Sequence, residues 1–97
     1  MTKLTGKQGR FLKGLGHHLN PVVMAGKEGV TPALLASLEE ALKVHELIKV
    51  KVQEGCVMDR KEAAALLAKE SGAAAVQVLG RTILLYRPAE ERKIELP

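Results

Sequence analysis

The sequence is poor in aromatic residues and cysteine, and it has no long hydrophobic run. Its 97 residues include one Phe, one Tyr and no Trp. Platforms that stack nucleic-acid bases need such rings, so this scarcity argues against base stacking as a main binding mode. Cys56 has no second cysteine to pair with, which fits a reducing compartment. With neither a signal peptide nor a membrane-length apolar stretch, we expect a cytoplasmic protein without a membrane partner.

Acidic residues are missing from the first 27 positions. The chain carries a net charge of +4, and this segment holds only cations: Lys3, Lys7, Arg10, Lys13 and Lys27. A concentration of positive charge predicts a polyanionic partner. A merely solvated basic helix is the simpler alternative, but the length of the acid-free run weakens it.

Catalytic and metal-binding patterns are also missing. There is no Ser/His/Asp order, and no His lies near Cys56 to activate it. His17 and His18 are adjacent and point about 100° apart on a helix, so they do not chelate as an i, i+4 pair would. We expect no enzyme activity, no metal, no cofactor and no small-molecule substrate. Cys56 is interpreted as a small apolar residue.

The first predicted element is a basic amphipathic helix. Thr5 and Gln8 have the spacing of a capping box, which predicts that the helix begins there. At about 100° per residue, one face is apolar and carries Phe11, Leu12, Leu15 and Leu19. The opposite face carries Lys7, Arg10, Lys13 and His17. We expect the apolar face to be buried and the basic face to meet RNA phosphates.

A glycine loop follows a short apolar strand at residues 22–24. The loop is Gly26-Lys27-Glu28-Gly29, and Thr31-Pro32 behind it is a helix start signal. Glycines permit close approach of another backbone, a helix N-terminus attracts phosphate, and Lys27 adds a cation. We expect all four loop residues to contact RNA. The alternative is a plain tight connection, because a lone Gly-x-x-Gly is a weak motif.

The rest of the chain alternates helices and strands. Helices are predicted at 32–44 and 59–70, and strands at 46–52, 74–79 and 82–87, the last two forming a hairpin. Ile48, Val50 and Val52 alternate with Lys49 and Lys51, which predicts one buried and one basic, uncovered sheet face. Arg81, in the hairpin turn, is either a solvated turn residue or a further phosphate contact. From residue 88 the chain is polar, and we expect it to fray.

Several segments occur together in a characteristic order. They are Thr5-Gly6-Lys7-Gln8, Arg10-Phe11-Leu12, His17-His18-Leu19-Asn20-Pro21-Val22-Val23, Gly26-Lys27-Glu28-Gly29, His45-Glu46-Leu47-Ile48-Lys49-Val50 and Leu79-Gly80-Arg81-Thr82. Over residues 3–87 this pattern resembles the bacterial YhbY family. Its members are stand-alone CRM domains, named for chloroplast RNA splicing and ribosome maturation.

The resemblance implies a two-layer α/β domain at residues 1–87, followed by a polar tail at 88–97. The order would be α-β-α-β-α-β-β, with a four-stranded mixed sheet and helices on one face. That fold is similar to the C-terminal domain of bacterial translation initiation factor three. The resemblance also implies binding to rRNA in precursors of the large ribosomal subunit, through the 26–29 loop and the basic first helix.

Two functional alternatives stay open from the residues themselves. The first is a monomer that contacts the phosphate backbone of structured RNA, with shape supplying most of the recognition. The second is an adaptor that binds only protein, through the acidic tail or the open sheet face.

Overall fold

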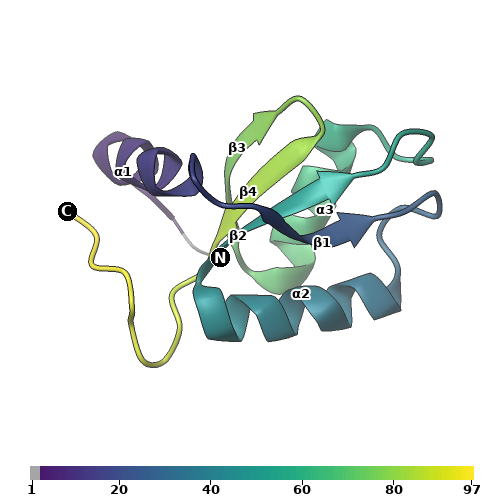
Figure 1. Ribbon diagram of the computed structural model, residues 1–97. Coiled ribbons are helices and arrows are strands. Elements are labelled where there is room, and N and C mark those ends of the chain that lie inside the picture. Colours follow the sequence, from purple (N-terminus) through teal and green to yellow (C-terminus); the bar gives the residue numbers. More distant parts are fainter. Residues whose placement is uncertain (1–2) are drawn as a thin grey trace.

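The computed structural model describes residues 3–97, which form three helices and four strands (Figure 1). In chain order these are α1 (Gly6–Gly16), β1 (Pro21–Ala25), α2 (Pro32–His45), β2 (Leu47–Val52), α3 (Arg60–Ser71), β3 (Ala74–Leu79) and β4 (Thr82–Tyr86). The predicted order of elements is confirmed. None of the helices in this part of the chain has the length and hydropathy needed to cross a membrane.

The four strands form one mixed sheet in the order β1-β2-β4-β3. β1 runs parallel to β2, whereas β4 is antiparallel to both β2 and β3. The predicted β3–β4 hairpin is present, and Gly80 in its turn has a φ of +59°, which a glycine adopts without strain. β1 and β3 are therefore the edges of the sheet, and β4 lies inside it.

The helix starts are those that the capping residues predict. At α1, the Gln8 N–H donates to Thr5 Oγ1 at 3.2 Å and the Thr5 N–H donates to Gln8 Oε1 at 3.1 Å. At α2, the Leu34 N–H donates to Thr31 Oγ1 at 3.1 Å, and Pro32 occupies the first helical position. These side chains satisfy N–H groups that have no partner within the helix.

The main hydrophobic core lies between one face of the sheet and the helices α2 and α3. Ile48, Val50 and Val52 are each no more than 4% exposed there, while Lys49 is half-buried and Lys51 exposed on the other face. The alternation predicted for this strand is thus confirmed, since successive strand residues point to opposite faces. Cys56 packs against the same core, in keeping with its interpretation as an apolar residue.

α1 lies on the opposite face of the sheet, which differs from the expectation that all helices share one face. The face of Lys49 and Lys51 is therefore partly covered, and not uncovered as predicted. Its Leu12 is fully buried against Leu47, Leu84 and Tyr86. On β4 these last two alternate with Ile83 and Leu85, which belong to the main core. Because a buried strand can be apolar on both sides, β4 supports a second, smaller core beneath α1.

Fewer residues of the first helix and the segment after it are buried than the sequence predicts. Leu12 and Gly16 are buried, whereas Phe11, Leu15 and Leu19 remain 37–41% exposed. Gly16 supplies the reason: a Cβ there would lie 2.7 Å from both methyl carbons of Leu84. The helix therefore comes closest to the sheet along Leu12 and Gly16, and Phe11 and Leu15 are left on its flank.

The prediction that the tail frays is wrong, because Glu46 holds it. Glu46 follows α2, is fully buried, and has a φ of +61°. Its carboxylate accepts hydrogen bonds from the backbone N–H groups of Ala89 at 2.7 Å, Lys93 at 2.6 Å and Ile94 at 2.9 Å. Burial raises the pKa of Glu46, but these three N–H donors and the positive charge of Arg92 together lower it by more, and the net pKa lies below its ordinary value.

Further contacts tie the tail to α1 and α2. Ile94 and Leu96 pack against the second core, next to Leu12 and Tyr86. The Lys93 ammonium donates to the Val44 carbonyl at 2.8 Å. At the end of the chain the Gln8 side-chain amide donates to the Pro97 carbonyl at 3.2 Å. Residues 88–97 therefore close the second core, and they connect the end of α2 to the start of α1.

Glu46→Gln tests this anchoring. An amide keeps one acceptor oxygen but turns an NH₂ group toward an N–H donor, so we expect a loss of about 1–3 kcal/mol in the free energy of unfolding at pH 7. Because the folded-state pKa is lowered, the carboxylate stabilises the fold above the unfolded pKa of about 4.3, and that contribution is lost as pH falls through the folded pKa. Denaturant unfolding at several pH values measures both effects.

The control is Glu40→Gln, at an exposed position on α2. The wild-type protein and the control should lose stability together below about pH 4, while Glu46→Gln, which lacks the titrating group, should lose less over that interval. Identical pH profiles for all three proteins would show that Glu46 does not hold the tail.

Candidate nucleic-acid interface

The basic face of α1 is exposed along its whole length. Its four members follow one another at intervals of three, three and four residues, so they form one stripe on the side turned away from Leu12. They are Lys7, Arg10, Lys13 and His17, all exposed, and we refer to them as the α1 stripe. The geometry is therefore the one that the sequence predicts, and RNA contact by these side chains stays a prediction.

The cations of the α1 stripe have no acidic partner within residues 3–97. Across residues 3–97 only two ion pairs form, Arg81 with Glu54 at 3.7 Å and Arg87 with Glu39 at 2.6 Å. Neither pair includes the stripe or Lys27. Charges without an internal partner are free to meet phosphate, and they produce a positive potential that favours a polyanion.

The glycine loop is a turn that is fixed at both of its ends. The Gly29 N–H donates to the Gly26 carbonyl at 3.0 Å, and the Val57 N–H donates to the Lys27 carbonyl at 3.0 Å. Gly29 is buried with a φ of +78°, and a Cβ there would lie 3.1 Å from Met58 Cγ. Gly29 is therefore required by the backbone itself, whereas no positive φ or close contact requires a glycine at position 26.

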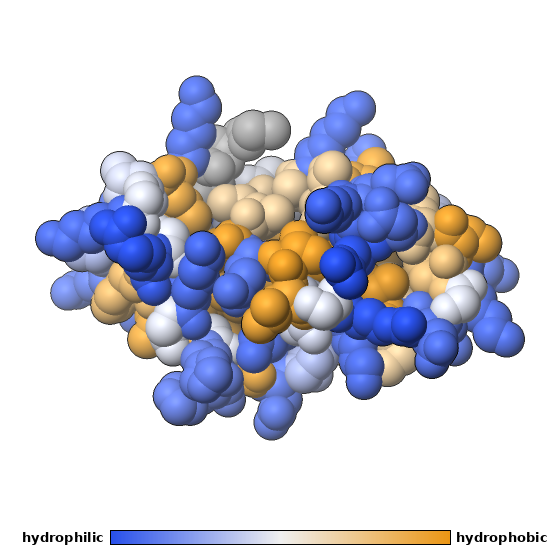
Figure 2. All heavy atoms as spheres, turned by 90° about the horizontal axis from the view of Figure 1, so that it is seen from above, coloured by the Kyte–Doolittle hydropathy of each residue, from blue (hydrophilic) through white to orange (hydrophobic). Residues whose placement is uncertain are grey.

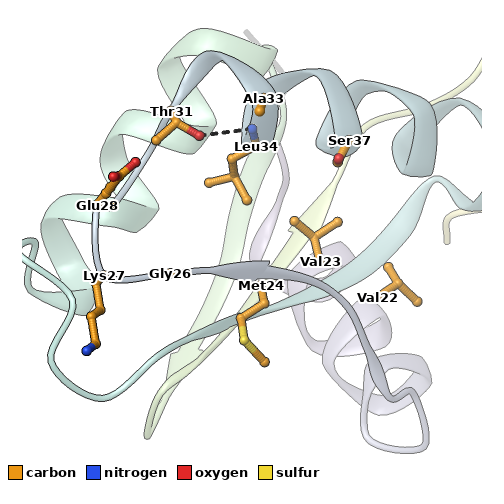
Figure 3. Close-up of a pocket in the computed structure, with 11 residues that line it drawn as sticks. Val22, Val23, Met24, Gly26, Lys27, Glu28, Thr31, Ala33, Leu34 and Ser37 are labelled. Atoms are coloured by element: carbon orange, nitrogen blue, oxygen red, sulfur yellow. Dashed lines mark hydrogen bonds between the residues drawn. The ribbon is translucent and has the colours of Figure 1, made fainter.

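The loop borders a hollow of about 500 Å³ between β1 and α2 (Figure 3). Val23 and Leu34 point toward each other at its base, while Lys27 and Glu28 leave the loop in different directions. Both of these charged residues are exposed. The Lys27 side chain leaves the loop on the same side as Met24, away from Leu34, and its exposed ammonium can reach a phosphate.

The start of α2 offers fewer donors to an anion than the sequence suggests. Pro32 at the first position has no N–H, and the Leu34 N–H is already bound to Thr31. Of the first three helical positions, only Ala33 keeps an N–H for a ligand. The helix dipole remains, but attraction of phosphate at this end depends mainly on Lys27 and the loop backbone.

The α1 stripe and the glycine loop lie at opposite ends of β1 (Figure 1). With five residues of about 3.3 Å each, β1 separates them by about 17 Å, so one RNA strand could reach both. Arg81 lies at the same end of the sheet as the loop, since its carbonyl accepts the Val52 N–H at 2.7 Å and Val52 pairs with Ala25. Its side chain lies beside Glu54 and lines a separate hollow with Arg60 and Lys61. A phosphate contact by Arg81 therefore stays a prediction.

Two basic residues of the sheet were not included among the predicted contacts. Lys49 and Lys51 lie on the face of β2 that carries α1, where Lys51 pairs with Met24 of β1 and Lys49 with Pro21. Their alternation with Ile48, Val50 and Val52 was the available signal. The alternation predicts on which face of the sheet Lys49 and Lys51 lie. Only the pairing of β1 with β2 shows that they lie between the α1 stripe and the loop.

Comparisons with known proteins agree on one family. Residues 4–87 match the CRS1 / YhbY (CRM) domain. A Haemophilus influenzae protein named "RNA-binding protein" is 52% identical over 97 residues, spanning 100% of this chain and 98% of its own length. "Probable RNA-binding protein YqeI" of Bacillus subtilis is 46% identical over 95 residues, spanning 97% and 99%.

A solved structure is similar over almost the same span. The solution structure of a hypothetical protein from Staphylococcus aureus has a TM-score of 0.85 and 38% identity, and the match covers 98% of this chain and 100% of that one. The similarity in sequence and the similarity in fold therefore extend over nearly the whole chain. This protein belongs to the CRS1/YhbY (CRM) domain family.

Proposed function

We propose that the protein binds RNA, as a non-catalytic monomer in the cytoplasm. The observation that carries the proposal is the α1 stripe together with Lys27: exposed cations with no acidic partner within residues 3–97. Contacts from such side chains to the phosphate backbone set position and orientation, while the shape of a folded RNA supplies recognition. The names of the relatives support the same class of ligand.

The target that we propose is rRNA in precursors of the large ribosomal subunit, where the protein assists assembly. This finer step is supported by the resemblance to the YhbY family. Crosslinking the purified protein to ribosomal precursors, followed by mapping of the linked nucleotides, tests it. Crosslinks confined to mature small-subunit RNA would contradict this target.

The adaptor alternative is tested by RNase treatment. An adaptor that recruits protein through its tail needs that tail to be free. In this structure the tail backbone donates hydrogen bonds to Glu46, and its apolar residues pack in the second core. An RNA-binding protein should lose its ribosomal partners when the RNA is digested. Partners retained after digestion would favour the adaptor.

The affinity for structured RNA should fall steeply with salt. If Lys7, Arg10, Lys13 and Lys27 each neutralise one phosphate, a plot of log affinity against log salt concentration should have a slope of about −3 to −4. Titrations of one RNA hairpin at several salt concentrations measure this slope. Neutralising two of the four cations should make it shallower by about 2, and a wild-type slope near zero would exclude phosphate contact.

Lys27→Asp tests the loop separately from α1. The change removes a cation and places a second anion beside Glu28, so RNA affinity at fixed salt should fall tenfold or more, which corresponds to ~1.4 kcal/mol. Position 27 is exposed, so the free energy of unfolding should change by no more than about 0.5 kcal/mol.

The matched control is Lys69→Asp, which makes the same change in net charge at an exposed position of α3. It should leave RNA affinity within about twofold of the wild type. If Lys27→Asp folds normally and binds RNA as the wild type does, the loop is only a connection and the interface is confined to the α1 stripe.

A further inference from the structure

A second groove lies between α1 and the face of the sheet on which α1 packs. It has a volume of about 420 Å³, and it is distinct from the hollow beside the glycine loop. α1 contributes Lys13 and His17 to its walls, and the sheet contributes Lys49, Gln77, Leu79 and Thr82. Seen from above in Figure 2, apolar side chains gather in the middle of this side of the molecule, with hydrophilic side chains around them.

The register of the sheet explains how these side chains come together. Lys49, Leu84 and Gln77 are direct partners across β2, β4 and β3, and Lys51, Thr82 and Leu79 form the next row. Directly opposite residues share one face of the sheet. Each row therefore begins with a lysine near β1 and includes a leucine and an uncharged polar residue, so a cation, an apolar surface and a hydrogen-bonding group stand side by side.

The charge of the groove favours an anion. Lys13, His17 and Lys49 line it, and none of the described residues around it is acidic. Across residues 3–97 the lysine side chains of the groove make no ion pair. Lys51 extends the positive charge along β2 toward β1 and the glycine loop. A phosphate backbone that runs from the α1 stripe to the loop would pass over this part of the sheet.

The rest of the groove matches a base better than it matches a duplex. Leu84, only 2% exposed, lies in its floor, and Leu79 is 68% exposed at its rim. Gln77 and Thr82 have polar side chains that form no hydrogen bond within residues 3–97. The outside of a helical stem offers mainly sugar and phosphate, whereas an unpaired base offers apolar faces and polar edges.

We propose that this groove receives an unpaired nucleotide of the RNA. The base lies over Leu79, its polar edge meets Gln77 and Thr82, and the flanking phosphates meet Lys13 and Lys49. The inference rests on the proposed function, since the same RNA contacts the α1 stripe. No aromatic ring is needed, because apolar contact and hydrogen bonds hold the base, and a nucleotide that is already unpaired is the least costly to take out of a helix.

The experiment compares two RNA hairpins that differ only by one unpaired nucleotide in the stem. The full-length protein is titrated with each hairpin at one salt concentration, and the measured quantity is the ratio of the two affinities. We expect the wild type to prefer the hairpin with the unpaired nucleotide by tenfold or more. Gln77→Met and Thr82→Val should each lower this preference at least threefold, while affinity for the fully paired stem stays within about twofold.

Charge variants complete the comparison. Lys49→Gln should weaken binding of both hairpins, and binding of the one with the unpaired nucleotide by the larger factor. Lys69→Gln, with the same change in net charge on α3, should affect neither. Thermal melting of each variant shows that the fold is intact, and Thr82→Val, which keeps the shape of the side chain, serves if Gln77→Met proves unstable.

The outcomes separate this inference from the proposed function. Equal affinity of the wild type for the two hairpins, or a preference unchanged in Gln77→Met and Thr82→Val, overturns the inference and leaves the proposed function standing. Failure to bind either hairpin overturns both. If polyglutamate binds as tightly as RNA, and Lys49→Gln weakens the binding of both by the same factor, the groove is a surface for acidic protein. This result also overturns the inference.

Discussion

The buried carboxylate of Glu46 holds together parts of the chain that are far apart in sequence. It lies at the junction of α2 and β2, its own carbonyl accepts the Arg87 N–H at 2.9 Å just after β4, and its side chain binds three N–H groups of the tail. A carboxylate buried away from water is stable only when its oxygens accept hydrogen bonds. The conformation of the α2–β2 junction therefore depends on the tail, and the position of the tail depends on the junction. The positive φ of Glu46 is a strained backbone conformation that these bonds maintain.

The position of α1 depends on this arrangement. Ile94 and Leu96 of the tail complete the small core in which Leu12 is buried, and Gln8 reaches the last residue of the chain. Without the tail, one side of that core would be open to water. The two faces of the sheet thus have different roles: α2 and α3 on one face supply most of the buried surface, and the other face carries α1, the cations and the groove.

The sequence predicted what local signals determine. The caps at Thr5 and Thr31, the alternation through Ile48 and Val50, and the hairpin at Gly80 each depend on residues a few positions apart. The exposure of the α1 stripe followed from helical spacing in the same way.

What escaped prediction depends on contacts across the chain. Glu46 and Ala89 are 43 positions apart, and no local pattern indicates that a glutamate binds the tail. The apolar residues of α1 indicated a buried face that included Phe11 and Leu15, but the absence of a side chain at Gly16 moved the contact to another line of the helix. For the candidate site, the sequence predicted the cations, whereas their lack of acidic partners and the place of Lys49 opposite α1 required the fold.

The close contact between Gly16 and Leu84 has a consequence for α1 itself. Lys7, Arg10 and Lys13 repel one another at spacings of three residues, and Gly9 and Gly14 lower helix propensity further, so this segment alone would be a poor helix. It is helical because the sheet and the tail hold it in place. The conformational entropy of ordering the helix is therefore lost when the protein folds and not when a ligand arrives. α1 is therefore already ordered in the free protein, and neutralising its charges would relieve a repulsion that the free protein sustains.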